Sequence, residues 1–267
     1  MAVGGGVGGL VVLLIALFTG MDPSALLQED PGTQQGGGGA LEDCETGADI
    51  DTNPECRFVA VQNSIEDFWE YEFAEAGSQY EPATFTAFTG SVSTGCGSAS
   101  SQVGPFYCPP DQGVYLDLGF FETMKTQLGA EGGDFAEAYV VAHEYGHHVQ
   151  NLTGQMDRVR TQQGPDSDAV RLELQADCLA GMWSRFATEV PGADGEILIQ
   201  ELTQQDVEEA LDAARAVGDD RIQQRTSGRV DPDAWTHGSA EQRMKWFTRG
   251  REQGNLRACD TFSVGSL

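Results

Sequence analysis

Two histidines four residues apart, with a glutamate directly after the first, form the pattern with the clearest chemistry in this sequence. They are His143, Glu144 and His147, in the run HEYGH. On an α-helix, residues four apart lie on the same face, about 40° apart around the axis. Both imidazoles can therefore reach one Zn²⁺, and Glu144 is placed to position the attacking water and take its proton. The alternative interpretation is a helix with two structural histidines and an exposed glutamate.

A pair of carboxylates with the same spacing, Glu173 and Asp177, follows in a second apolar, helix-compatible segment. Two carboxylates facing into such a helix are costly to bury unless a cation compensates them. We therefore expect Glu173 to be the third zinc ligand. Asp177 would accept the Nδ1–H of a ligand histidine and fix its tautomer. The alternative is an exposed pair on an amphipathic helix.

Two further residues of the HEYGH segment need an explanation. His148 lies five residues after His143, about 140° around the helix, so it cannot share the ligand role and is expected to pack or to support the site. Gly146 is unfavourable in a helix interior by about 1 kcal/mol relative to alanine. Its presence predicts a close approach of the second helix or of the metal.

Four segments together resemble a known family, the bacterial "putative neutral zinc metallopeptidase" family. The resemblance covers roughly residues 20–262 and implies a zincin fold, one Zn²⁺ and peptide hydrolysis. The layout is also similar to that of the membrane-anchored CAAX-prenyl and heat-shock zinc proteases. In those proteins the distal Glu is a ligand and the Asp supports one, which implies these roles for Glu173 and Asp177. The segments are AHEYGHHVQNLTG (142–154), RLELQADCLAGMW (171–183), CGSASSQVGPFYCPPDQGVYLDLGFF (96–121) and THGSAEQRMKWF (236–247).

An oxyanion formed during amide hydrolysis needs a hydrogen-bond donor besides the metal. His237, in the run THGS, resembles a Thr-His motif of the related membrane proteases and is the candidate catalytic donor. Its alternative role is structural, at the start of a helix. Tyr145 is a weaker candidate, because it lies about 100° around the helix from Glu144. Arg243 could hold Glu173 or Asp177, or lie on the surface.

The charge balance restricts the partners. The chain has 42 acidic and 15 basic residues, for a net charge of −27. Such a chain does not bind nucleic acid or anionic lipid through charge. We therefore expect no nucleic acid as a partner, while a peptide or protein substrate is what the family resemblance implies.

The chain divides into three parts. Residues 1–21 are apolar and long enough to span a bilayer, and we expect an uncleaved transmembrane anchor rather than a signal peptide. Residues 22–43 are polar and Gly-rich and are expected to form a flexible linker, and residues 44–267 the zinc metallopeptidase domain. Six cysteines suggest an oxidising compartment, so the domain is expected outside the cytoplasm on a single-pass membrane protein. Their order suggests the pairs Cys44–Cys56, Cys96–Cys108 and Cys178–Cys259, although other pairings remain possible.

The expected fold class is α+β, a zincin-like domain with a small antiparallel or mixed sheet packed on the HEYGH helix and the Glu173 helix. The strand at 113–118 is expected to lie antiparallel to a bound peptide. A segment at 94–112 is expected to be a loop. The expected strands are 57–61, 81–88 and 113–118, and the expected helices are 63–77, 133–152, 168–188, 201–217, 219–226 and 239–252.

Three function classes follow from the sequence. The first is a membrane-tethered zinc metalloendopeptidase. The second is a zinc hydrolase of another amide or ester, which the motifs also allow. The third is a non-catalytic interaction domain, against which the intact Glu144 argues, because a binding domain has no chemical use for it.

Overall fold

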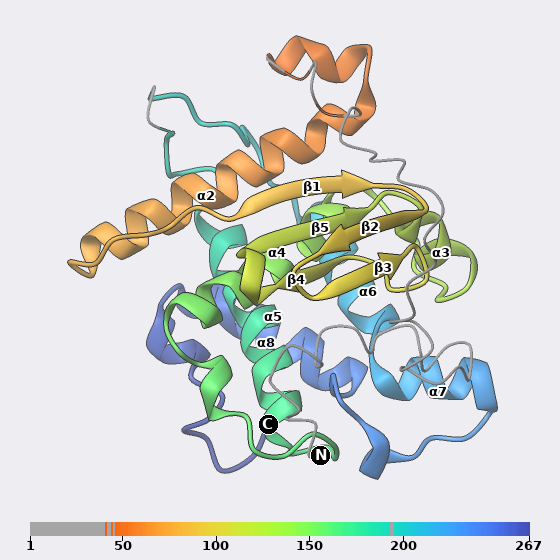
Figure 1. Ribbon diagram of the computed structural model, residues 1–267. Coiled ribbons are helices and arrows are strands. Elements are labelled where there is room, and N and C mark those ends of the chain that lie inside the picture. Colours follow the sequence, from red (N-terminus) through yellow and green to blue (C-terminus); the bar gives the residue numbers. More distant parts are fainter. Residues whose placement is uncertain (1–40, 42–43, 45, 193–194) are drawn as a thin grey trace.

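Helix α4 (Asp134–Leu152), which carries the HEYGH motif, lies between a small sheet and two further helices (Figure 1). The computed structural model describes residues 41, 44, 46–192 and 195–267. Helix α4 contacts α2, α5, α6, β4 and β5, and sixteen of its residues are buried, from Phe135 to Gln150 without interruption. A helix apolar on all sides belongs in a core. The metal-ligand candidates are therefore held by a central element and not by a surface loop.

The three-stranded sheet has the order β1-β5-β4. Strand β1 (Thr84–Phe88) is parallel to β5 (Gly113–Asp117), and β4 (Phe106–Cys108) is antiparallel to it. All five residues of β5 are buried, as expected for a central strand. A separate hairpin pairs β2 (Ser91–Thr94) with β3 (Gly97–Ser100). Its Ala99 packs with residues of the sheet in a small second hydrophobic cluster.

In the described part of the chain, six more helices surround these elements. Helix α2 lies along the sheet beside the start of β1, where Glu66 accepts a hydrogen bond from the backbone of Ala83. Helices α5 and α8 lie on the other side of α4, and α6 and α7 complete that layer (Figure 1). The helices are α2 (Arg57–Glu75), α3 (Phe120–Thr126), α5 (Asp168–Phe186), α6 (Gln204–Ala216), α7 (Asp219–Ser227) and α8 (Ala240–Gln253). Short 3-10 turns occupy Gly47–Asp51, Pro54–Cys56, Pro109–Asp111, Met156–Arg158, Pro232–Ala234 and Leu256–Cys259.

Three glycines allow α4, α5 and α8 to pack with their backbones in contact. A Cβ on Gly146 of α4 would lie 2.9 Å from the Cα of Ala176 on α5. Added Cβ atoms on Gly181 and Gly250 would clash with backbone oxygens across the α5–α8 interface. The close approach of a second helix predicted from Gly146 is thus confirmed.

Several sequence-based expectations about the elements were wrong. Residues 57–61 are not a strand but the first turns of α2, which brings Phe58 and Phe68 onto the buried side of one helix. The expected loop at 94–112 contains β3 and β4. The strand expected at 113–118 is present as β5, and it is central because β1 and β4 flank it. Strand β1 begins at Thr84, two residues after Pro82, and Ser239 caps the N-terminus of α8.

The three disulfides match the suggested pairs: Cys44–Cys56, Cys96–Cys108 and Cys178–Cys259. The second joins β4 to the hairpin loop beside it. The third joins α5 to the C-terminal segment, next to Asp177. The cysteine pattern therefore reinforces the elements on both sides of α4.

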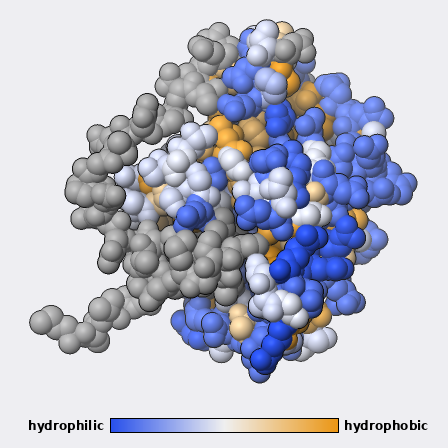
Figure 2. Space-filling view, turned by 90° about the vertical axis from the view of Figure 1, so that its right-hand side faces the viewer, coloured by the Kyte–Doolittle hydropathy of each residue, from blue (hydrophilic) through white to orange (hydrophobic). Residues whose placement is uncertain are grey.

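The expected membrane anchor at 1–21 lies outside the described residues, as does nearly all of the expected linker at 22–43. Among the helices that the structure describes, none is long and apolar enough to cross a membrane. Figure 2 shows the side of the molecule at the right of Figure 1, where hydrophilic residues cover most of the described surface. This agrees with the large excess of acidic residues.

Candidate metal centre

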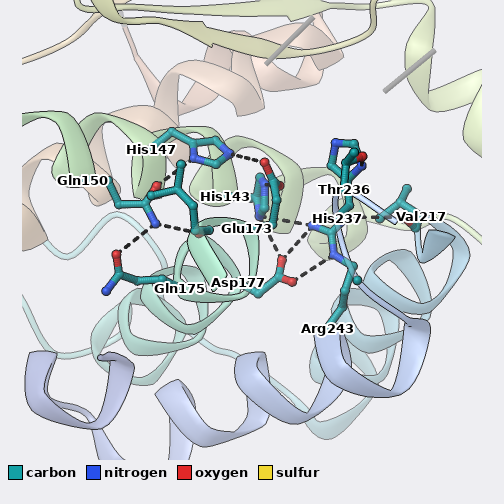
Figure 3. A network of polar contacts seen from close by, with 12 residues as sticks. His143, His147, Gln150, Glu173, Gln175, Asp177, Val217, Thr236, His237 and Arg243 are labelled. Carbon is teal, nitrogen blue, oxygen red and sulfur yellow. Dashed lines mark hydrogen bonds and ion pairs between the residues drawn. The ribbon is translucent and has the colours of Figure 1, made fainter. Parts of the chain in front are cut away.

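The side chains of His143, His147 and Glu173 converge at one point between α4 and α5 (Figure 3). One ligand atom from each lies within 4.8 Å of the others. Nε2 of His143 is 3.2 Å from Oε2 of Glu173, and Nε2 of His147 is 3.6 Å from Oε1. All three residues are buried, with exposed fractions of 4%, 2% and 7%. Two imidazoles and one carboxylate are a known ligand set of catalytic zinc, so the residues fit Zn²⁺.

Helix geometry produces this convergence. His143 and His147 lie on one face of α4, and Glu173 and Asp177 lie on one face of α5. The contact of Gly146 with Ala176 brings the two faces close enough for the four side chains to meet. A larger residue at position 146 would push the carboxylates away from the imidazoles.

His143 is held from behind by Asp177. Nδ1 of His143 is 2.8 Å from Oδ1 of Asp177, which is completely buried. Arg243 of α8 donates to both oxygens of Asp177 at 2.9 Å, and Tyr139 donates through its hydroxyl. Burial alone would raise the pKa of Asp177, but Arg243 and His143 outweigh it and lower this pKa to about 2. The ionised carboxylate accepts the Nδ1–H and leaves Nε2 of His143 facing Glu173.

His147 is held from behind by a chain of amides that the sequence reasoning missed. Nδ1 of His147 is 2.8 Å from Oε1 of Gln150. The Nε2 of Gln150 donates to the carbonyl of Leu172 at 2.7 Å and to Oε1 of Gln175 at 3.1 Å. Gln175 in turn donates to the carbonyl of Cys259. Because Gln150 presents its oxygen to the ring, Nδ1 of His147 must be the donor and Nε2 is left for a metal.

Only a weak signal could have pointed to Gln150. It is a polar residue one turn after His147 in a segment that is otherwise buried, with no exposed surface of its own. A buried amide without a partner is costly, so its presence implies partners nearby. The identity of those partners depends on α5 and on the C-terminal segment, which no local pattern specifies.

Glu144 lies beside this group and is 97% buried, since its exposed fraction is 3%. Its Oε2 has no hydrogen-bond partner among the described residues. Burial raises the pKa of Glu144, while the nearby His147 and His143 act to lower it. An unpartnered buried carboxylate oxygen next to two imidazoles is suited to hold and deprotonate a water.

Comparison with known proteins agrees with this geometry. A model of the family described as "Putative neutral zinc metallopeptidase" matches residues 1–262. The chain belongs to this family.

Two relatives have similar length. An "Uncharacterized protein Rv2575" of Mycobacterium tuberculosis (strain ATCC 25618 / H37Rv) is 48% identical over 257 residues, which cover 94% of this chain and 86% of the relative. An "Uncharacterized protein YpfJ" of Escherichia coli (strain K12) is 41% identical over 267 residues, covering 96% and 87%. No solved structure matches the chain.

His237 lies near the candidate metal centre, and its role stays a prediction. Its Nδ1 is 2.7 Å from the hydroxyl of Thr236 and 3.4 Å from Oδ1 of Asp219. Burial alone would lower the pKa of His237, but the charges of Glu173 and Asp219 raise it. Because Nδ1 is engaged, Nε2 is the nitrogen that can face a substrate. Asp219 was not singled out from the sequence, although it also accepts the backbone N–H groups of residues 236–238.

The other sequence candidates have separate positions. Arg243 is buried against Asp177, so its surface alternative is wrong. Tyr145 lies near Glu66 of α2, which together with burial raises the pKa of this tyrosine. His148 uses both ring nitrogens, with Tyr107 at Nδ1 and the carbonyl of Glu81 at Nε2. Its ring packs against tyrosines, which is the packing role expected for it.

Proposed function

We propose that this protein is a membrane-anchored, extracytoplasmic zinc metalloendopeptidase. The observation that carries the proposal is the buried convergence of His143, His147 and Glu173 with the unpartnered Glu144 beside them. Membership in the zinc metallopeptidase family supports it. The three disulfides are typical of an oxidising compartment and support the extracytoplasmic location. The apolar residues 1–21 supply the anchor.

The metal would be held by Nε2 of His143, Nε2 of His147 and the carboxylate of Glu173. When bound, Zn²⁺ lowers the pKa of a water and polarises the scissile carbonyl. Glu144 takes the proton of the attacking water and returns it to the leaving amine. His237 donates a hydrogen bond from Nε2 to the developing oxyanion.

The chain's own residues prepare these steps. Asp177 and Gln150 fix the tautomers of the two histidines, so that both Nε2 atoms face Glu173 before any ligand arrives. The pKa of Asp177, lowered to about 2, keeps this carboxylate ionised near neutral pH. The site is therefore preorganised, which is the condition for a large rate enhancement.

The substrate that we propose is an extended peptide that lies at one edge of the sheet. Strand β4 is an edge strand in the described sheet, antiparallel to β5. The residue before β4, Pro105, lines the same cavity as His143 and Glu144. We propose that the substrate backbone lies beside Pro105, at the start of this strand, because the three residues of β4 themselves are buried. Strand β5 lies between β1 and β4, and the expectation that the strand at 113–118 runs antiparallel to a bound peptide stays a prediction.

The test is a comparison of the full-length wild type with Glu144→Gln. We expect one zinc per chain in both proteins by elemental analysis, and cleavage of a peptide library by the wild type only. A loss of two to four orders of magnitude is typical when a general base is removed (about 10²–10⁴-fold). Glu241→Gln, an exposed change on α8, is the matched control and should behave as wild type. Zinc binding without peptide cleavage by the wild type would contradict the peptidase assignment, and absence of zinc would contradict the metal site.

A further inference from the structure

A small, partly open cavity adjoins Glu144 and extends away from the metal-ligand candidates. Its volume is about 30 Å³, and it lies between α3, α4, α8 and the junction of α6 and α7. Glu144 and His143 form one end of it. The rest of the wall is mostly apolar and includes Phe120, Leu128, Val140, Val217 and Ile222.

The position of the cavity relates it to the scissile bond. Glu144 must reach both the attacking water and the leaving amine, which places the reacting bond within hydrogen-bonding distance of its carboxylate. Val140 lies one turn before Glu144 on the same face of α4. A group in the cavity would therefore belong to one of the two residues that flank the bond.

The chemistry of the wall favours an apolar group. Besides Glu144 and His143, the polar side chains of the wall are Tyr139 and Arg243. Both of these donate hydrogen bonds to Asp177. A polar substrate group would lose its hydration without gaining a free partner. An aliphatic group would give up no hydrogen bonds to water and would gain contact with the surrounding valine, leucine and isoleucine side chains.

The volume limits the size of that group. One water-sized probe needs about 10–15 Å³ on this measure, so the cavity has room for roughly two such groups. That corresponds to side chains between alanine and valine. Leucine and phenylalanine would have to displace the wall, which a close-packed interior resists.

We propose that this cavity is a specificity subsite that binds a small aliphatic side chain next to the scissile bond. The class of substrate is then a peptide or protein with alanine or valine at that position. The inference rests on the proposed peptidase function and adds to it the residue at which cleavage occurs.

The experiment is cleavage-site profiling with the zinc-loaded full-length protein. A peptide library with all residues represented on both sides of each bond is digested, and the products are identified by mass spectrometry. We expect the wild type to select alanine and valine at one flanking position, at least several-fold over leucine and phenylalanine. Each methylene that finds a matching cavity is worth roughly fourfold.

Two neighbouring valines give a matched pair of variants. Val140→Ala removes two methyl groups from the wall and should shift the preferred residue toward leucine, by about tenfold in relative cleavage rate. Val141→Ala removes the same groups from the next residue, which is buried but does not line the cavity, and should keep the wild-type profile. Ile222→Val enlarges the cavity from α7 and should give a shift of about fourfold in the same direction.

The outcomes separate the two proposals. Cleavage without any preference at either flanking position would overturn the subsite and leave the peptidase intact. The subsite would also be overturned, with the peptidase intact, if Val140→Ala and Ile222→Val both keep the wild-type cleavage profile. A shift of that profile by Val141→Ala as large as theirs would lead to the same conclusion. No cleavage by the zinc-loaded wild type would overturn the peptidase and the subsite together.

Discussion

Replacement of Gln150 by methionine tests the idea that ligand orientation is fixed from behind the metal site. Methionine has nearly the same length and shape but can neither accept from Nδ1 of His147 nor donate to Leu172 and Gln175. The ring of His147 would lose the partner that fixes its tautomer. Loss of such a partner typically weakens metal affinity by about 10–100-fold. We therefore expect the zinc dissociation constant to rise by that factor.

The cost to folding is expected to be at least as large as the effect on zinc, because a 10–100-fold change in affinity corresponds to about 1.4–2.7 kcal/mol. Gln150 makes three buried hydrogen bonds, at 2.7, 2.8 and 3.1 Å. Each removed bond contributes about 0.5–1.5 kcal/mol, and leaving Nδ1 of His147 unpaired costs about 1–3 kcal/mol. The carbonyl of Leu172 lies within α5 and keeps its helical partner, so the free energy of unfolding should fall by about 2–4 kcal/mol.

The assay is competition with a chelator of known affinity, alongside thermal unfolding of the metal-free protein. Gln175→Met changes the next amide in the chain and should weaken zinc binding less than Gln150→Met, because His147 keeps its direct partner. Gln205→Met, an exposed change on α6, is the control. Unchanged zinc affinity in Gln150→Met, in a protein that still folds, would refute the reasoning.

For two further substitutions, the burial of the replaced residue determines whether the free energy of unfolding rises or falls. Burial raises the pKa of Glu66 to about 7, from about 4.5 in the unfolded chain. The stability that the protonated Glu66 contributes is therefore fully present below pH 4.5 and is lost as the pH rises through 7. Between pH 5 and pH 8 we expect Glu66→Gln to gain up to about 3 kcal/mol relative to wild type in denaturant unfolding, and a pH-independent difference would contradict this. Arg243→Gln leaves Asp177 buried without its cation, and should lower the free energy of unfolding by about 3–5 kcal/mol, with Arg243→Lys intermediate; equal stability of the three proteins would argue against the pair.

The placement of the metal-site residues could be predicted because it depends on local geometry. A spacing of four residues on a helix puts two side chains on one face wherever the helix packs. The sequence therefore predicted that His143 and His147 would share one face of their helix, and that Glu173 and Asp177 would share one face of theirs. The structure brings these residues together, while their roles as ligands and partners stay predictions.

The parts that failed depend on contacts between distant segments. Residues 57–61 carry strand-forming side chains, but as the start of α2 they pack against α4 and the sheet, and tertiary packing overrides such preferences. Strand β4 is three residues long and sits between a cysteine loop and a proline pair, so no alternating pattern reveals it. The amide chain through Gln150 was missed for the same reason, because its other members lie on α5 and at Cys259.

The two imidazoles of the site share one helix but are restrained by different parts of the molecule. His143 is oriented through Asp177 by Arg243 of α8, and His147 through Gln150 and Gln175 by the C-terminal segment at Cys259. Both lines of support pass through α5, which also supplies Glu173. The disulfide Cys178–Cys259 and the glycine contact with α8 fix α5 on its far side. A shift of α5 would therefore move the carboxylate and both imidazole supports together, so the precision of the metal site depends on α5 more than on the helix that carries the HEYGH motif.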